Sequence, residues 1–370
     1  MKILYVTTIG ITMGFFKSFI KGLIEEGHTV EIACNDADAP VPAFYSELGC
    51  RVHRLSCSRS PFAKGNLMAV KEIRRLVKAN GYDIVHCHTP IAAACTRLAC
   101  RKLRKKQGVK VFYTAHGFHF YKGAPLKNWM VYYPVEKLCA RYTDKLITIN
   151  SEDFALAQKK MKAKEVVYVP GVGVDLTRFR SLTVDKVAKR RELGIPESAT
   201  LLLSVGEVNQ NKNHQVIVRA MAQLQRDDLH YMIAGVGHKQ DALKQQATAL
   251  GIGDKLHLLG YRNDVADLLS VADCFVFPSY REGLSVSLME AMSCGLPCVV
   301  SRIRGNTDLI DDKGGALFNP HKPEECVDAL RAVLDGDSAI MRDHNKQKIQ
   351  FFSLESVLGM MYALYEIESR

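Results

Sequence analysis

Short apolar runs alternate along the chain with segments of helical periodicity. Residues 2–8 form the first apolar run, and Phe15, Phe19, Ile20 and Leu23 then recur at the three- and four-residue spacing of a helix. The same alternation predicts further strands at residues 29–34, 51–55, 83–88, 109–114, 144–149 and 165–169. Strands that alternate with helices are typical of a parallel sheet covered on both faces.

A Pro- and Gly-rich stretch at residues 169–174 interrupts the alternation and predicts a linker. The alternation then restarts, and strands are expected at residues 200–205, 229–234, 255–259, 274–278 and 296–301. We therefore expect an α/β fold with two Rossmann-like domains, residues 1–170 and 171–353, that face a central cleft. Residues 354–370 include a final amphipathic helix, and the pattern alone does not decide whether it belongs to the second domain or packs back on the first.

The charge of the chain is divided unequally between its two parts. Residues 1–175 hold 27 Lys and Arg against 14 Asp and Glu, a net of +13, whereas residues 176–370 hold 23 against 25, a net of −2. A strongly basic part is typical of a surface that faces nucleic acid, an anionic lipid surface or a phosphorylated ligand. Solubility alone is the other explanation.

The eleven cysteines are odd in number and scattered, and Met1 leads directly into a predicted strand. These features favour reduced thiols and a cytoplasmic protein. His86, Cys87 and His88 are consecutive on a strand, where neighbouring side chains point to opposite faces, so we expect no metal site there. No apolar run is long enough to span a bilayer, so membrane contact is expected to be peripheral.

Residues 279–297 carry the most informative pattern. A polar loop that contains Gly283 follows a predicted strand, Ser285 or Ser287 is placed to cap a helix, and a helix N-terminus of this kind favours a phosphate group. Glu282 lies in the loop and Glu290 in the helix, and either carboxylate can accept hydrogen bonds from the vicinal hydroxyls of a sugar or a ribose. The alternative is that both glutamates are solvated residues at a helix start.

These residues, from Glu282-Gly-Leu-Ser to Glu290-Ala-Met-Ser-Cys-Gly-Leu-Pro, resemble the signature of the retaining glycosyltransferases of family 4. That family has the two-domain GT-B fold and uses nucleotide-sugar donors without a metal or other cofactor. The stretches 116–125 and 204–215 further resemble the branch that builds bacterial capsular polysaccharide and exopolysaccharide. The resemblance implies a UDP-sugar as donor and an undecaprenyl-diphosphate-linked saccharide as acceptor.

The resemblance also assigns roles to residues of the second domain. Glu290 is expected to bind the ribose, and Glu282 the donor sugar. The backbone N–H groups of Gly283, Leu284 and Ser285 are expected to meet the sugar and the diphosphate.

The stretch after the strand at 200–205 departs from the family pattern. Lys212 matches the family lysine that neutralises the donor diphosphate, but Glu207 stands where the family usually has an arginine. A basic residue elsewhere, Asn211 or Asn213 would have to compensate for this reversal of charge.

In the first domain, His116 stands where the family places a histidine near the transferred sugar. Its imidazole is expected to bond a sugar hydroxyl or to stabilise developing charge. His119 is either an acceptor-side residue or a packing residue. Gly14, at the start of the first helix, is expected to lie near a phosphate, although ordinary turn geometry would explain it equally well.

The cationic cluster at residues 101–106 and the aromatic and basic stretch at 118–133 suit a lipid headgroup surface. We therefore expect a cytoplasmic enzyme, peripherally bound to the inner face of the cell membrane, with no nucleic-acid partner. Two alternatives remain at this point: a sugar-nucleotide epimerase of GT-B fold, and a membrane-surface binding protein whose active site has decayed, which Glu207 would explain.

Overall fold

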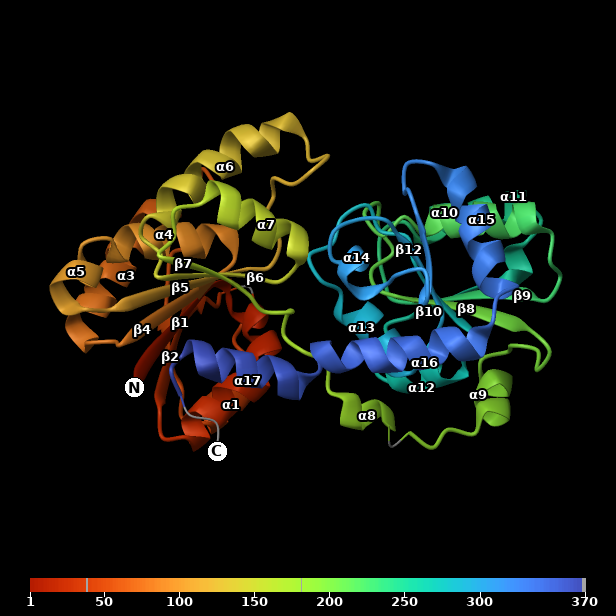
Figure 1. Ribbon diagram of the computed structural model, residues 1–370, viewed down its shortest axis with the longest axis horizontal. Helices are drawn as coiled ribbons and strands as arrows, with labels where there is room; N and C mark the ends of the chain where they lie inside the picture. Colours follow the sequence, from red (N-terminus) through yellow and green to blue (C-terminus); the bar gives the residue numbers. More distant parts are fainter. Residues whose placement is uncertain (38, 181, 368–370) are drawn as a thin grey trace. The chain divides into compact units, whose positions relative to one another are not determined.

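The computed structural model describes residues 1–37, 39–180 and 182–367 (Figure 1). The chain divides into two compact units. Unit 1 comprises Met1–Val172 together with the chain from Leu358 onward, and unit 2 comprises Gly173–Val357. Each unit is built on a parallel sheet with helices around it, which confirms the predicted α/β fold with two Rossmann-like domains.

Unit 1 contains a seven-stranded sheet of order β3-β2-β1-β4-β5-β6-β7, parallel throughout. Its strands are β1 (Lys2–Ile9), β2 (Thr29–Asn35), β3 (Arg51–Arg54), β4 (Ile84–His88), β5 (Lys110–Ala115), β6 (Lys145–Thr148) and β7 (Glu165–Tyr168). All five residues of β4 are buried, as expected for a central strand that is covered on both faces.

Helices and 3₁₀ turns connect these strands. They are η1 (Gly10–Phe16), α1 (Lys17–Glu25), α2 (Phe44–Glu47), α3 (Gly65–Asn80), α4 (Pro90–Cys100), α5 (Leu103–Gln107), α6 (Leu126–Ala140) and α7 (Ser151–Lys160). On one face of the sheet a single apolar core includes Ile73 of α3, Ala92 of α4 and Val85 of β4.

Unit 2 contains a six-stranded sheet of order β10-β9-β8-β11-β12-β13, also parallel. Its strands are β8 (Thr200–Val205), β9 (Leu229–Ala234), β10 (Leu256–Gly260), β11 (Cys274–Phe277), β12 (Cys298–Ser301) and β13 (Gly315–Phe318). The first five were predicted. The edge strand β13 was not, because four residues that begin with glycine carry too short an apolar run.

The helices of unit 2 form layers on both faces of its sheet. They are α8 (Leu176–Arg180), α9 (Lys186–Glu192), α10 (His214–Leu224), α11 (Gln240–Ala249), η2 (Gly253–Lys255), α12 (Val265–Val271), α13 (Val286–Ser293), α14 (Asn306–Leu309), α15 (Pro323–Leu334), α16 (Ser338–Lys348) and η3 (Ile349–Phe352). Leu201 and Leu203 enter one core and Leu202 the other, as the two-residue period of a strand requires.

The last helix, α17 (Leu354–Leu364), begins in unit 2 and continues into unit 1. In unit 1 it lies beside α1 (Figure 1). The rings of Phe19 and Tyr362 are 5.4 Å apart, and a Cβ at Gly22 would stand 1.8 Å from the Tyr362 hydroxyl. Gly22 therefore leaves room for the Tyr362 hydroxyl, which a side chain at this position would displace.

Candidate functional site

Both sheets have a point at which the strand order reverses direction. In unit 1 this point lies between β1 and β4, and in unit 2 it lies between β8 and β11. Loops that leave adjacent strands at such a point diverge, and ligands of open α/β sheets bind at the carboxyl ends of those strands. Lys212 follows β8, and Glu282 follows β11, so both predicted donor-side residues lie at the switch point of unit 2.

The two loops of this switch point are joined by hydrogen bonds. Asn211 accepts a bond from the backbone N–H of Tyr280 through its carbonyl (2.8 Å), and its side chain donates to the carbonyl of Arg281 (3.0 Å). Asn213 donates from Nδ2 to the carbonyl of Pro278 (3.2 Å). The asparagines of the β8–α10 loop therefore fix the shape of the β11–α13 loop.

Lys212 and Glu282 form the central contact of the site. Lys212 Nζ lies 2.9 Å from Glu282 Oε1 and 4.4 Å from the centre of the Phe277 ring. The two side chains are only 19% and 16% exposed, so this ion pair is shielded from bulk water. Among the described residues, Oε2 of Glu282 has no hydrogen-bond partner, which leaves this oxygen able to accept a bond from a ligand hydroxyl.

The N-terminus of α13 lies directly after Glu282. Ser285 is the N-cap residue, in extended conformation, and its Oγ accepts a hydrogen bond from the N–H of Leu288 (3.3 Å). The first turn of α13 contains no acidic side chain. Gly283, Leu284 and Ser285 thus form the approach to a helix terminus whose remaining N–H groups favour an anion.

Arg304 and Gly305 contact the backbone of the β11–α13 loop, and the sequence did not predict this role. Arg304 Nε donates to the carbonyl of Glu282 (3.1 Å), and a Cβ at Gly305 would lie 2.1 Å from the carbonyl oxygen of Gly283. Gly305 also has a φ of +76°. The only signal in the sequence was an arginine and a glycine just after a predicted strand, which is too common a pattern to single out.

Glu290 lies on the second turn of α13, and its side chain is partly buried. Burial raises the pKa of Glu290 above its ordinary value, and the positive charge of Arg178 on α8 acts in the opposite direction. In the described part of the chain, the Glu282 side chain hydrogen-bonds to Lys212 and not to Glu290. The two glutamates therefore present separate acceptors along the loop and the helix.

Glu207, at the position where an arginine was expected, is exposed. Its Oε2 accepts a bond from Asn209 Nδ2 (2.7 Å), and Oδ1 of the same asparagine accepts from the backbone N–H of Lys212 (3.0 Å). The carboxylate is thereby engaged by an amide, and Lys212 pairs with Glu282 instead. The negative charge of Glu207 therefore does not pair with Lys212.

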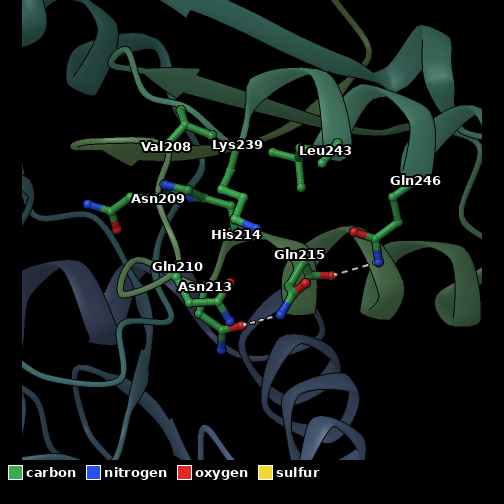
Figure 2. A pocket seen from close by; sticks show the side chains of 10 residues that line it. Val208, Asn209, Gln210, Asn213, His214, Gln215, Lys239, Leu243 and Gln246 are labelled. Carbon is green, nitrogen blue, oxygen red and sulfur yellow. Dashed lines mark hydrogen bonds between the residues drawn. The ribbon is translucent and has the colours of Figure 1, made fainter.

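A second cation stands near the same loop. Lys239, Asn209, Gln210 and Asn213 are among the residues around a cavity of about 90 Å³ between the β8–α10 loop and the start of α11 (Figure 2). The side chain of Lys239 extends into this cavity beside His214 (Figure 2). Lys239 is therefore a basic residue next to the β8–α10 loop.

In unit 1, His116 follows the last residue of β5, at the carboxyl edge of the sheet. Its Nε2 lies 3.1 Å from Nδ1 of His88 at the end of β4. Burial lowers the pKa of His116 to about 4, so that its imidazole is neutral at pH 7. A neutral imidazole has one N–H donor and one acceptor nitrogen, which suits hydrogen bonding to a hydroxyl group.

A buried polar chain lies behind His116. His86 Nδ1 is 2.6 Å from the hydroxyl of Tyr365, which in turn donates to the hydroxyl of Tyr5 (3.2 Å), and His86 Nε2 is 2.8 Å from Thr114 Oγ1. The rings of His86 and His88 have centres 4.2 Å apart. Cys87 points to the opposite face and donates to the carbonyl of Phe112, so the three residues do not converge, as predicted.

Gly14 lies in η1 and is exposed. A Cβ at this position would meet nothing within 4 Å, whereas one at Gly10 would meet the backbone of residues 39–41 at 2.4–2.6 Å. The close backbone approach in this turn is therefore made at Gly10. That Gly14 lies near a phosphate stays a prediction.

The described residues contain no group of three or more His, Cys, Asp or Glu side chains placed to hold a metal ion. No helix in the described chain is both long enough and apolar enough to cross a membrane.

Known families and proteins agree with this architecture. The family model "Glycosyltransferase Family 4" matches residues 15–178, and the model "Glycosyl transferases group 1" matches residues 185–350. Among solved structures, HepE from Anabaena in complex with UDP superposes with a TM-score of 0.81 at 19% identity, covering 99% of this chain and 100% of that one. Sucrose-phosphate synthase from Thermosynechococcus elongatus gives a TM-score of 0.80 at 20% identity, with 99% and 98% covered.

Curated relatives extend over most of the chain. "Putative glycosyltransferase EpsD" of Bacillus subtilis (strain 168) is 34% identical over 345 residues, which cover 88% of this chain and 89% of that protein. The "UDP-Gal:alpha-D-GlcNAc-diphosphoundecaprenol alpha-1,3-galactosyltransferase" of Escherichia coli is 30% identical over 285 residues, 73% of this chain and 72% of its own length. With its two parallel-sheet units of GT-B type, the chain belongs to glycosyltransferase family 4.

Proposed function

We propose that the chain is a retaining, metal-independent glycosyltransferase. It moves a sugar from a nucleotide-diphosphate sugar, a UDP-sugar, to a lipid-linked saccharide during the synthesis of bacterial surface polysaccharide. The contact between Lys212 and Glu282 beside the N-terminus of α13 carries the proposal, because it places a cation, a carboxylate and free helix N–H groups at one switch point.

The donor is assigned to unit 2. Lys212 and the first turn of α13 neutralise the diphosphate, whose negative charge grows as the bond to the sugar breaks. Oε2 of Glu282 accepts a bond from a hydroxyl of the transferred sugar, and Glu290 accepts bonds from the ribose. Lys239 supplies the second positive charge that Glu207 does not provide. The choice of UDP is supported by the E. coli relative, named for UDP-Gal, and by HepE, which was solved with UDP.

The acceptor is assigned to unit 1. His116 bonds a hydroxyl of the sugar near the reacting carbon, and its neutral state allows it to donate or accept there. The name of the E. coli relative includes a diphosphoundecaprenol-linked saccharide, which supports a lipid-linked acceptor for this chain too. The excess of basic residues in the first half of the sequence would hold the enzyme at an anionic inner membrane surface.

Titration calorimetry of the full chain with UDP and GDP, followed by transfer assays with a panel of UDP-sugars, tests the proposal. We expect UDP to bind, and Glu282→Ala to reduce transfer at least about a hundredfold, because the carboxylate serves both Lys212 and the sugar. Glu324→Ala, at an exposed site on α15, is the matched control and should transfer at the normal rate. Transfer by Glu282→Ala at the normal rate would contradict the assignment.

Incubation with a UDP-sugar and no acceptor separates transfer from epimerisation. We expect unchanged donor. A new sugar epimer or free UDP in quantity would instead support the epimerase, and failure of UDP to bind at millimolar concentration would support a decayed surface-binding protein.

A further inference from the structure

Unit 1 contains a cavity of about 270 Å³ that the donor site does not use. It opens at the carboxyl ends of β1 and β4, which form the switch point of this unit. The polar and aromatic residues that line it are Thr8, Thr12, Arg59, Thr89, His119 and Tyr132. The volume is near the ~300 Å³ lower end of small-molecule pockets.

The wall of this cavity combines three kinds of group. Thr8 and Thr12 supply hydroxyls, and Arg59 supplies a guanidinium, whereas the Thr89 hydroxyl is already bonded to Thr8 and to the carbonyl of His88. His119 and Tyr132 form an aromatic pair with ring centres 4.5 Å apart and planes tilted by 30°. No described residue that lines the cavity carries a carboxylate, so the charge of its wall is positive.

Arg59 is available to a ligand. Its side chain is exposed, and it forms no ion pair or hydrogen bond with any residue in the described part of the chain. Its neighbour along the sequence, Arg54, is by contrast held by Asp36 at 2.7 Å. A guanidinium can form two parallel bonds to a phosphate, and this geometry favours phosphate over a neutral polar group.

The cavity adjoins the histidine proposed to meet the transferred sugar. Thr89 directly follows His88, which bonds His116, and His119 is three residues beyond His116. Thr89 has a φ of +63°, which is rare for a β-branched residue and persists only where neighbours enforce it. Thr8 enforces it through its backbone N–H (3.1 Å) and its hydroxyl (2.6 Å), both bonded to Thr89 Oγ1.

We propose that this cavity binds the glycosyl phosphate part of the acceptor. The sugar ring stacks on Tyr132, the hydroxyls of Thr8 and Thr12 bond its hydroxyl groups, and Arg59 binds the phosphate. The inference rests on the proposed function, since it names the chemical class of the acceptor and the residues that select it. Arg59 and Tyr132 are specificity residues and take no part in breaking the donor bond.

Two kinds of molecule carry a glycosyl phosphate group: a free sugar phosphate and a lipid-linked sugar diphosphate. Phe62, whose side chain is 84% exposed, is three residues from Arg59 in the sequence. A lipid chain leaving the cavity would cover such a side chain, so the binding of the two kinds of molecule should differ.

Calorimetry of the full chain with the 1-phosphates of glucose, galactose and N-acetylglucosamine tests the site without any donor. We expect at least one of them to bind, and the corresponding methyl glycoside to bind at least about tenfold more weakly. Arg59→Ala should weaken phosphosugar binding about tenfold and Arg59→Lys less, since lysine keeps the charge without the paired geometry. Arg75→Ala, an exposed arginine on α3, is the control and should change affinity less than about twofold.

The site is overturned if no hexose 1-phosphate binds better than its methyl glycoside, or if Arg59→Ala binds the phosphosugar normally. A farnesyl-diphosphate-linked N-acetylglucosamine then distinguishes the two kinds of molecule. If the farnesyl-linked compound binds more tightly than the 1-phosphate, and Phe62→Ser removes this difference, the acceptor is lipid-linked. If the two compounds bind equally, the ligand is a free phosphosugar. Both outcomes support the phosphosugar site.

UDP titration of the same preparations separates this inference from the proposed function. A protein that binds UDP but no phosphosugar retains the proposed function and loses the cavity assignment. A protein that binds a phosphosugar through Arg59 but does not bind UDP retains the cavity and loses the proposed donor.

Discussion

The ammonium group of Lys212 has a protein partner in Glu282 and a proposed ligand partner in the donor diphosphate. The two roles are compatible, because a lysine has three N–H donors. They also make Lys212 sensitive to substitution, since its removal would leave a carboxylate largely buried without a counter-charge. Because the proposed ligand of Lys212 is the diphosphate, a substitution at this position should weaken the binding of a nucleoside diphosphate far more than the binding of the nucleoside.

We predict that Lys212→Ala weakens UDP binding at least about tenfold, equivalent to ~1.4 kcal/mol, and changes uridine binding less than about twofold. Calorimetry with both ligands measures this difference. Lys255→Ala removes a lysine from the same unit, at a contact with exposed Asp227, and should bind both ligands normally. Equal losses for UDP and uridine in Lys212→Ala would count against a role at the diphosphate.

Tyr365 offers a second test at a single position. Its hydroxyl forms hydrogen bonds with both His86 and Tyr5, and all three side chains are essentially inaccessible to solvent. Tyr365→Phe should lower the free energy of unfolding by about 1–3 kcal/mol, because it leaves a buried imidazole nitrogen unpaired. Urea unfolding measures the change.

The control for this substitution is Tyr362→Phe on the same helix. Among the described residues the Tyr362 hydroxyl has no hydrogen-bond partner, and the ring is partly exposed. Its loss should change stability by less than about 0.5 kcal/mol. Similar effects of the two substitutions would show that the buried chain contributes nothing beyond ring packing.

All strands except β13 were predicted, including the four-residue strands β3, β6, β7, β11 and β12. Strand β13, Gly315–Phe318, was missed because it begins with glycine and carries only a short apolar run. The order of the strands could not be predicted, because no local feature of the sequence specifies that β4 lies beside β1. The alternation of side chains on β4 did predict that His86, Cys87 and His88 do not converge.

The site was predictable where a loop and a helix are continuous in sequence. Ser285 was a candidate cap because a serine precedes an apolar periodic segment, and the structure bears this out. Contacts between distant segments could not be foreseen: Lys212 and Glu282 are 70 residues apart, and His86 and Tyr365 are 279 apart. Arg304 was missed for the same reason, since only folding brings it to the Glu282 carbonyl.

Three strands of unit 1 meet at one carboxylate, and this contact predicts a pH dependence. Glu31 on β2 contacts Lys2 of β1 (3.1 Å) and His53 of β3 (2.6 Å), and Tyr82 donates a hydrogen bond to it (2.5 Å). Burial alone would raise the pKa of Glu31, but the bonds from Tyr82, His53 and Lys2 outweigh it and lower this pKa to about 2 from 4.5.

Because the pKa of Glu31 is lower in the folded than in the unfolded protein, its contribution to stability is present above about pH 4.5 and is lost as the pH falls towards 2. The contribution is of the order of 3 kcal/mol at most. Urea unfolding at several pH values should show a smaller loss of stability between pH 4.5 and 2 in Glu31→Gln than in the unaltered protein. Parallel curves would contradict the prediction.

At the scale of the whole molecule, the excess of positive charge lies in the first half of the sequence. The net charge of +13 on residues 1–175 includes exposed Lys102, Lys105 and Lys106 at and around α5, whereas Arg104 in the same stretch is engaged by Asp144. A solvated cluster of lysines near an anionic lipid surface contributes ~1 kcal/mol per charge. The proposed membrane association therefore depends on this cluster and on low ionic strength.

Simultaneous replacement of Lys102, Lys105 and Lys106 by Glu should reduce binding to vesicles of phosphatidylcholine with about one third phosphatidylglycerol by at least tenfold. Sedimentation with the vesicles measures binding, and pure phosphatidylcholine should bind neither protein.

The matched control reverses three other exposed lysines of the same unit, Lys159, Lys160 and Lys162 at the end of α7. It alters the net charge by the same amount. If both triple variants lose vesicle binding equally, net charge and not the cluster around α5 governs association.

The course of α17 has a consequence for synthesis on the ribosome. Tyr5 and His86 emerge early, yet their hydroxyl partner Tyr365 is made only after the whole of unit 2. The nascent first unit must wait with the apolar and polar groups that α17 later covers still open to solvent. A premature stop codon shortly before position 365 would thus damage the part of the protein that is translated first, and leave intact the sheet translated second.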